Sequence, residues 1–472
     1  MQPQELDTTR TIGAQSGPVV VVGAGISGLC AAYRLKGRGA EVIVLEKGAE
    51  AGGTMQTQSV EGWLVEAGPN SALESTPLLG ELFQDLGITA QRCYANERAS
   101  KRYILRGGRL LAIPTTPSSV ITSPLWSLGG KLRILKEPFI GRAYEEESVA
   151  QFVTRRLGHE FLDYAIDPFV AGVYAGDPEK LSIRAAFPKM YALESNHGGL
   201  FKGMIALKRK RKGTGGARGS KLFSFVRGMQ TIPRAIASDL GAALRLNASV
   251  ENIVPMRAGK NPVHVVSVRQ EGKLESITAS AVVLASPAVA TGAVIRAIDP
   301  ETAGVLESVY YPPVASVFLG FCERDIGRPL DGFGFLVPKR EERNILGAIW
   351  SSALFPGRSP HGCAAITAFV GGSRRPDLVS LDDQALVDLL LTELRTIMNI
   401  GGDPVFRRIN RWERAIPQYT MGYERVLRTI DRFEQNFRGA FVCSNFRGGI
   451  SVGDCVTNAT AVAERVVQHL ST

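Results

Sequence analysis

The sequence has few of the residues that build disulfide scaffolds and metal centres. It contains six cysteines and five histidines in 472 residues, and neither set is clustered. The cysteines stand at positions 30, 93, 322, 363, 443 and 455. Because there is no Cys-x-x-Cys pair and no group of histidines, we expect reduced thiols, no metal site and a cytoplasmic protein.

Long hydrophobic runs are also missing. No stretch approaches the roughly 18 to 20 uninterrupted apolar residues that are needed to cross a bilayer. Residues 1–17 are polar and have no apolar core, so we expect a flexible tail and neither a signal peptide nor a membrane anchor. With 44% hydrophobic and 21% charged residues, the rest of the chain is typical of a globular protein of two or three domains.

Positive charge is in excess. The 55 basic and 45 acidic residues give a formal net charge of +10, and much of it lies between residues 98 and 227. The densest run, Lys208–Lys212, precedes a glycine-rich segment, which predicts a solvated flexible loop. Attraction to an anionic membrane surface, or to an acidic substrate or partner, is the alternative. We do not expect nucleic-acid binding, because no aromatic residue interleaves the run and no nucleic-acid module is recognised.

A glycine motif follows the first apolar strand, residues 19–22. Gly23 permits a tight turn, Gly25 lets the backbone approach a pyrophosphate, and Gly28 lets the next helix pack closely on the strand. Free amide hydrogens at the start of that helix face the anion. We therefore predict that a dinucleotide binds to Gly23, Ala24, Gly25, Ile26, Ser27 and Gly28.

The next strand, residues 41–45, ends at Glu46, where a ribose-hydroxyl acceptor is expected. A carboxylate there favours a free 2′-hydroxyl over a 2′-phosphate. The paired glycines at 52–53 are common in FAD enzymes and unusual in nicotinamide dehydrogenases. A longer dinucleotide runs on past the ribose and must pass close to the backbone. We therefore predict FAD, with Lys47, Gly53 and Thr54 among its contacts.

Two more segments are predicted to complete the flavin site. A strand at 63–67 runs into a turn of small residues, which suggests another wall of the site. Near the end of the chain, a strand at 439–445, a glycine-bearing loop and a helix at 452–469 follow one another. The positive end of that helix would stabilise a reduced, anionic flavin by up to about 2 kcal/mol. The predicted contacts are Gly68, Pro69, Asn70, Ser71, Ile450, Ser451 and Val452.

The order of elements predicts an α/β fold with a Rossmann-like FAD-binding domain, a mixed-sheet substrate domain and a helical cap. After the tail, we assign 18–95, 226–300 and 439–472 to the FAD-binding domain, 96–225 to the cap and 301–438 to the substrate domain. The chain is predicted to return to the FAD-binding domain with strands at 249–254, 264–269 and 281–287. The first of these strands brings Val250 to the cofactor. The cap helices are predicted at 149–157, 161–173 and 188–208.

The predicted substrate domain is rich in strands. Apolar runs at 313–321, 332–337, 346–351 and 364–370 are expected to form one mixed sheet that covers a cavity against the flavin. A surface helix is predicted at 382–398.

With these elements placed, the chain resembles the oxygen-dependent protoporphyrinogen oxidases over nearly its whole length, from Val19 to Leu470. The motifs common to such flavoproteins do not carry the resemblance alone. The specific segments are Gly68–Ser71, Gly172–Asp177, Gly332–Pro338, Leu354–Arg358, Val370–Gly372 and Ile416–Tyr419. That family has the amine-oxidase fold and holds a porphyrinogen under the flavin ring.

The resemblance implies that a porphyrinogen loses six electrons in three two-electron steps, and that molecular oxygen reoxidises FAD and yields hydrogen peroxide. It assigns Arg102 to a substrate propionate, which a guanidinium can grip by two charge-assisted bonds. It assigns Leu336, Ile349 and Phe369 to the faces of the macrocycle, and brings the backbone carbonyl of Gly172 to the reacting ring. No catalytic side chain is predicted, because a meso C–H hydride can pass to flavin N5 while the pyrrole nitrogens shed the proton.

Three alternatives stay open. The same chemistry on coproporphyrinogen III would give coproporphyrin III, and the basic middle zone could hold the two extra propionates. An amine oxidase fits the fold but not the segments Gly172–Asp177 and Leu354–Arg358. A binding module that keeps the fold without FAD is disfavoured by the intact glycine motif and by Glu46. Peripheral contact with the inner face of a membrane and a homodimer are also left open.

Overall fold

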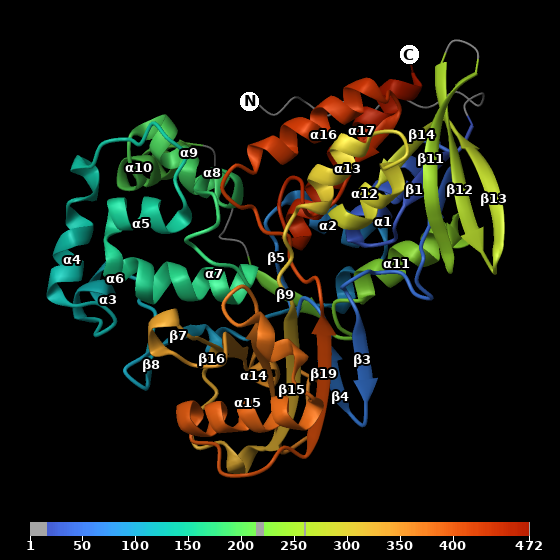
Figure 1. Cartoon of the computed structure of the whole chain (residues 1–472). Helices are drawn as coiled ribbons and strands as arrows, with labels where there is room; N and C mark the ends of the chain where they lie inside the picture. Colours follow the sequence, from blue (N-terminus) through green and yellow to red (C-terminus); the bar gives the residue numbers. More distant parts are fainter. Residues whose placement is uncertain (1–16, 214–220, 259–260, 472) are drawn as a thin grey trace.

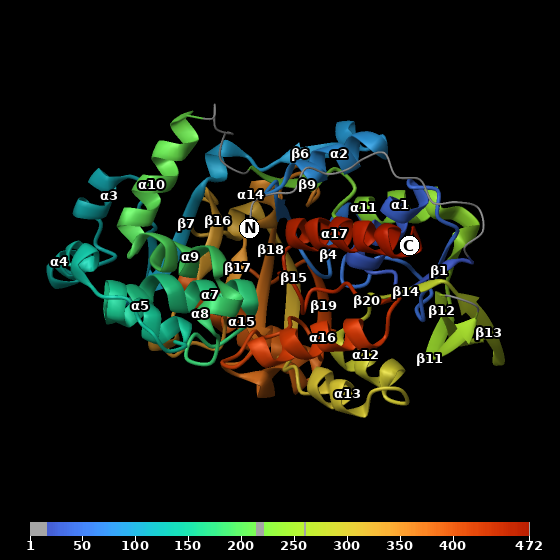
Figure 2. The ribbon, with the colours of Figure 1, turned by 90° about the horizontal axis from the view of Figure 1, so that it is seen from above.

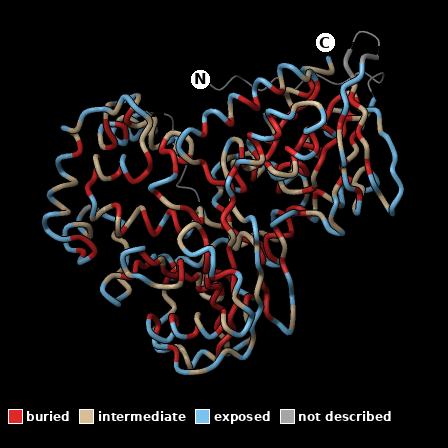
Figure 3. The backbone as a smooth tube through the Cα atoms, in the orientation of Figure 1, coloured by how far each residue is buried: buried red, intermediate tan, exposed pale blue. Residues whose placement is uncertain are grey.

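The computed structural model describes residues 17–213, 221–258 and 261–471. A parallel sheet, a mixed sheet and a helical cap lie around a common centre (Figure 1). One hydrophobic core covers one face of the parallel sheet, a second extends from its other face into the cap, and a third fills the mixed-sheet layer. The buried segments of the tube follow these cores (Figure 3). The predicted α/β fold is confirmed.

The parallel sheet is built from short, wholly apolar strands. Its order is β10 (Leu244–Arg245), β2 (Val42–Leu45), β1 (Val19–Val22), β14 (Ala281–Leu284) and β20 (Ala440–Val442), all parallel. Alternate residues serve opposite faces, which is why β1 can be four valines in a row. Val19 and Val21 pack against α1 (Ile26–Lys36) and α17 (Val452–Leu470), which lie against each other (Figure 2).

The other face of this sheet receives Val20 and Val22. They pack on an antiparallel sheet and on two short helices. These elements are β11 (Ala248–Ala258), β12 (Asn261–Gln270), β13 (Lys273–Ala279), α12 (Ala288–Ile295) and α13 (Pro300–Glu307). The carboxyl ends of β1 and β2 stay uncovered by these layers, and the predicted dinucleotide motif stands there.

The predicted mixed sheet has seven strands. Their order is β19 (Phe406–Trp412), β15 (Val314–Cys322), β18 (Cys363–Gly371), β17 (Gly347–Ile349), β16 (Gly332–Leu336), β7 (Lys101–Arg106) and β8 (Arg109–Ala112). Only the β16–β7 pair is parallel. The predicted surface helix, α15 (Asp383–Met398), buries its apolar side on one face. The sheet thus includes β7 and β8, which belong to the range 96–225 that we predicted to be the cap.

Shorter elements join these layers. They are β3 (Thr57–Val60), β4 (Trp63–Glu66), β5 (Ala72–Leu73), α2 (Pro77–Asp85), β6 (Arg92–Tyr94), β9 (Leu222–Phe225), α11 (Thr231–Leu240), α14 (Ser351–Leu354) and α16 (Glu424–Asn436). The cap holds α3 (Pro117–Thr122), α4 (Leu128–Leu135), α5 (Val149–Leu157), α6 (His159–Phe161), α7 (Asp167–Tyr174), α8 (Ile183–Ala186), α9 (Pro188–His197) and α10 (Leu200–Gly213).

Two cap helices differ from the prediction. The helix expected at 161–173 is divided by a π-helical turn at Leu162–Ile166, after which α7 begins with Pro168 in its first turn. The single helix expected at 188–208 is wrong. Gly198 takes φ +79°, which ends α9 in a left-handed cap before α10 starts.

The basic run also differs. We expected a loop from Lys208 onward, but α10 continues to Gly213, so Lys208 and Arg209 are helical and exposed. The glycine-rich segment 214–220 and residues 1–16 of the predicted tail lie outside the described residues.

A buried ion cluster ties the cap helices together. Arg156 of α5 is fully buried and donates to Glu137 at 2.9 Å and to Glu194 of α9 at 2.8 Å. Glu137 also accepts from Leu200 N at the start of α10. Burial raises the pKa of Glu194, but hydrogen bonds from Arg156, the backbone and Arg155 together hold it below its usual value. This stabilisation is present above the unfolded-state pKa and is lost as the pH falls through the lowered value.

Replacing Arg156 by Met should leave Glu137 buried without its cation and Glu194 with Arg155 alone, and lower the free energy of unfolding by about 3–5 kcal/mol. Denaturant unfolding followed by circular dichroism measures the loss. The matched control is Arg109→Met, which removes an exposed arginine. Equal midpoints for the two variants would contradict a stabilising role for the cluster.

Candidate functional site

Two glycine segments form a cradle at the carboxyl ends of β1 and β2. Gly25 and Gly52 make a β-bridge, and Gly52 N donates to Ala24 O at 2.8 Å. A Cβ atom placed on Gly53 would lie 3.3 Å from Gly25 Cα, whereas nothing lies within 4 Å of a Cβ on Gly25. The backbones therefore touch on one side and face open space on the other. This arrangement fits a pyrophosphate, which must approach backbone amides closely.

Glu46 stands at the end of β2 beside this cradle. Its carboxylate accepts from Ala24 N and from Gly48 N, each at 2.8 Å. Each oxygen keeps a further lone pair, so the side chain can also accept a ribose hydroxyl. Ala248 N donates to Glu46 O at 2.8 Å, which places the start of β11, and with it Val250, next to the same position. Lys47 is exposed at the rim.

A third segment closes the cradle. A Cβ on Gly68 would lie 1.9 Å from Thr54 O, so the predicted wall 68–71 packs directly on the segment that follows the paired glycines. The start of α17 is adjacent, because a Cβ on Gly453 would lie 2.2 Å from Ser75 Oγ. Ser451 caps this helix in a capping box with Asp454. The predicted FAD contacts on four separate segments are thus brought together.

The predicted substrate side chains share one face of the mixed sheet. Arg102 and Ile349 flank Gly334 on one rung, and Leu336 and Phe369 flank Gly347 on the next. The alternate residues of the same strands pack on α15, so the four side chains point away from that helix. Leu336, Ile349 and Phe369 are all half-buried, and Arg102 is exposed.

Helix α7 lies over this face. A Cβ on Gly172 would lie 2.3 Å from Leu336 Cδ2, so only glycine lets the helix come this close. Gly172 is in the last turn of α7, and Gly176 N, four residues on, donates to Val170 O instead. The Gly172 carbonyl is therefore outside the helical hydrogen-bond ladder.

Several residues of this face were not predicted. Gly334 and Gly347 stand between the larger side chains, where an added Cβ would lie 2.0 Å from Ala348 O and 2.4 Å from Phe335 O, and the alternating glycines in 332–334 were the signal. Phe169 lies three residues before Gly172 and four before Val173 on α7, and Phe169 and Val173 are 40% and 43% exposed. Their exposed apolar surface extends the apolar face formed by Leu336, Ile349 and Phe369.

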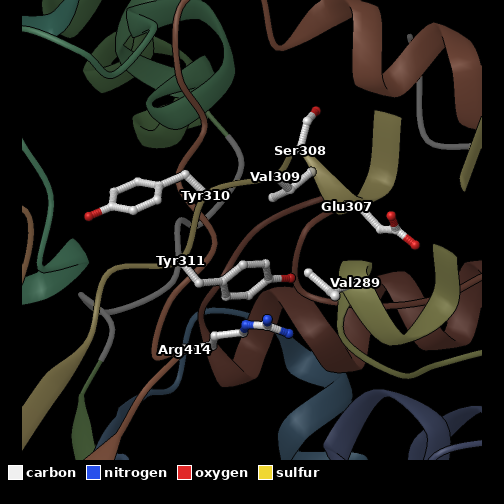
Figure 4. A pocket seen from close by; sticks show the side chains of 7 residues that line it. All are labelled: Val289, Glu307, Ser308, Val309, Tyr310, Tyr311 and Arg414. Atoms are coloured by element: carbon white, nitrogen blue, oxygen red, sulfur yellow. The ribbon is translucent and has the colours of Figure 1, made fainter. Parts of the chain in front are cut away.

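A separate cleft of about 450 Å³ lies between the start of α12, the end of α13 and the loops before β15 and after β19 (Figure 4). Its lining residues are Val289, Glu307, Ser308, Val309, Tyr310, Tyr311 and Arg414. Figure 4 shows the Arg414 guanidinium beside the Tyr311 ring. Burial raises the pKa of Tyr311 to about 12, and its hydroxyl accepts from Ala288 N at 3.1 Å. In the described part of the chain, no predicted cofactor or substrate residue lines this cleft.

Within residues 17–213, 221–258 and 261–471, no helix combines the length and the hydropathy that crossing a bilayer requires. The same ranges hold no group of side chains suited to bind a metal ion.

Comparisons with known proteins agree with this geometry. The model of the flavin-containing amine oxidoreductase family matches residues 26–467. Protoporphyrinogen oxidase 2 of Arabidopsis thaliana is 33% identical and is aligned over 96% of this chain and 94% of its own. Coproporphyrinogen III oxidase of Bacillus subtilis is 25% identical over 96% and 98% of the two chains.

The fold has a counterpart among solved structures. A crystal structure from Exiguobacterium sp. 255-15, described as a candidate protoporphyrinogen oxidase, matches with a TM-score of 0.79 and 22% identity over 97% of this chain and 100% of that one. The predicted FAD cofactor and the predicted family are both confirmed. The chain belongs to the flavin-containing amine oxidoreductases and, within them, to the FAD-dependent porphyrinogen oxidases.

Proposed function

We propose that the protein oxidises protoporphyrinogen IX to protoporphyrin IX, with molecular oxygen as the final acceptor and hydrogen peroxide as the by-product. The observation that carries the proposal is the apolar face of the mixed sheet. Arg102, Leu336, Ile349 and Phe369 stand on two adjacent rungs of this face, under α7. A flat, hydrophobic macrocycle with a carboxylate at its edge matches such a face.

Bound FAD supplies the two-electron acceptor for each of the three steps. The side chains of Leu336, Ile349 and Phe369 pack against the macrocycle and exclude water from the reacting carbon. Arg102 fixes the orientation by holding a propionate. The free carbonyl of Gly172 accepts a pyrrole N–H, and no side-chain base is needed.

Charge on β7 favours two propionates over four. Lys101 pairs with Asp331 at 2.6 Å, and Arg106 pairs with Glu160 at 2.8 Å. For Arg102, no carboxylate partner occurs among the residues that the structure describes, and its guanidinium lies 5.7 Å from the centre of the Phe333 ring. One uncompensated cation on this strand suits protoporphyrinogen better than coproporphyrinogen III, which would need more. Coproporphyrinogen III is the second candidate, on account of the relative in Bacillus subtilis.

The deciding experiment is side-by-side turnover of protoporphyrinogen IX and coproporphyrinogen III by the purified holoenzyme. Porphyrin fluorescence reports the product, and oxygen uptake reports the acceptor. We expect a higher kcat/KM for protoporphyrinogen IX, because fewer carboxylates must be desolvated next to a single free cation. A preference for coproporphyrinogen III would reverse the assignment, and turnover of neither compound would end it.

Arg102→Ala should raise KM about tenfold or more with a smaller loss of kcat. A hydrogen bond to a charged group contributes about 1.5–3 kcal/mol, and a propionate far from the reacting carbon is held alike in the ground and transition states. Steady-state kinetics test this. Lys101→Ala is the matched control, because Lys101 precedes Arg102 on the strand and points to the opposite face. Unchanged kinetics for Arg102→Ala would remove it from the site.

We also propose peripheral contact of the cap with the cytoplasmic face of a membrane. Helix α4 has no buried residue, and Leu128, Leu132 and Leu135 on it are 73%, 54% and 66% exposed. These leucines lie three and four residues apart and therefore form one stripe. The exposed lysine Lys136 follows, and the basic end of α10 is in the same cap. An apolar stripe with flanking cations suits an anionic lipid surface.

The double substitution Leu132→Glu and Leu135→Glu should lower the fraction of protein that sediments with anionic vesicles several-fold. Acidic side chains would lose the apolar contact and repel the lipid headgroups. Leu274→Glu is the matched control, since Leu274 is 58% exposed on β13, outside the cap. If the double variant sediments like the control, the stripe does not contact lipid.

A further inference from the structure

A buried carboxylate directly precedes the predicted flavin wall. Glu66 is the last residue of β4, and Ala67 and Gly68 follow it. Its exposure is only 4%, which is rare for an ionisable side chain unless its charge is compensated. The partners of Glu66 therefore decide how this wall is held.

Three segments converge on this carboxylate. Thr57 Oγ1 of β3 donates to it at 2.6 Å, and Met229 N, just before α11, donates at 2.8 Å. Arg358 Nη2 lies 3.8 Å from Glu66 Oε1 and comes from the loop after α14. The contacts of Thr57 and Met229 thus come from the FAD-binding layer, and the contact of Arg358 comes from the mixed-sheet layer.

Arg358 depends on this partner. It is 2% exposed, and its Nη2 donates to Ser224 Oγ at 2.6 Å and to Phe225 O at 3.3 Å. In the described residues its Nη1 is buried without an acceptor. Burial raises the pKa of Glu66 to about 7, against the lowering effects of Thr57 and Arg358. Removing either charge would leave the other uncompensated in the interior.

The residue after Glu66 is held from the opposite side. The Ala67 carbonyl accepts from Trp412 Nε1 of β19 at 2.8 Å and from Ser316 Oγ of β15 at 3.4 Å. Gly68 already packs on Thr54 O with no room for a Cβ. A small displacement of Glu66 would therefore either press the wall 68–71 against Thr54 or move it away from the mixed sheet.

We propose that Glu66 and Arg358 are a positioning pair that seats the wall 68–71 against the cofactor and joins it to the substrate-binding sheet. Neither residue needs to touch the reacting atoms. This inference rests on the proposed function only in taking the mixed-sheet face as the substrate surface. The pair would set the distance between cofactor and macrocycle.

The test is the FAD dissociation constant of Glu66→Gln, Arg358→Met and the double variant, measured by flavin fluorescence with no porphyrinogen present. We expect each single variant to bind FAD at least tenfold more weakly. The double variant should lose less than the product of the two single losses, because no unpaired charge remains buried. At saturating FAD, the visible circular dichroism of the flavin should change in both single variants, which loss of stability alone would not produce.

Glu61→Gln is the matched control, because Glu61 is exposed in the turn between β3 and β4 and undergoes the same chemical change. Its FAD affinity should stay within twofold of the wild type. If Glu66→Gln does not fold, Glu66→Asp keeps the charge but shortens its reach, and should show a smaller loss of affinity and the same spectral change. Wild-type affinity and spectrum in a folded Glu66 variant, or fully multiplicative losses in the double variant, would overturn the pair. Because no porphyrinogen is present, failure of the proposed activity would leave these results intact.

Discussion

Close approach of backbone segments that carry no side chain decides where a dinucleotide fits in this fold. Gly25 faces open space, Gly53 touches Gly25, and Gly68 rests on Thr54 with no room for a methyl group. The amides of these segments can meet an extended, anionic cofactor only because nothing projects between them.

Shared apolar clusters join the layers, and a few polar contacts between them add direction to their packing. Asp167, at the start of α7, accepts from Lys339 N and from Arg374 Nη2, each at 2.8 Å. Burial raises the pKa of Asp167, and Arg374 opposes that rise. This contact fastens α7 to the mixed sheet and so fixes the height of Gly172 above Leu336. The Glu66 contacts act in the same way on the cofactor side.

The local parts of this architecture could be predicted from sequence. The structures of the glycine motif, Glu46 and the apolar strands depend on residues that are close in the sequence. The structure places all three where the sequence predicted them. The position of β7 could not be predicted, because it pairs in parallel with β16, more than 200 residues away. The prediction missed the end of α9 at Gly198, because apolar residues continue at helical spacing both before and after this glycine. Positions on the substrate face came from resemblance, because alternating apolar residues alone cannot distinguish a cavity from a core.

The composition of the substrate face agrees with chemistry performed by the cofactor. On its two rungs the Thr367 hydroxyl bonds to Ser351 at 2.9 Å, and the strand residues that the structure describes on these rungs include no carboxylate or imidazole. Loss of a hydride would leave positive charge on the macrocycle, and in the proposed function the Gly172 carbonyl, at the negative end of α7, would accept from a pyrrole N–H. A side-chain base would add a desolvation cost and supply nothing that the pyrrole nitrogens lack. The protein's share of catalysis then lies in holding a flat substrate dry and at a fixed distance.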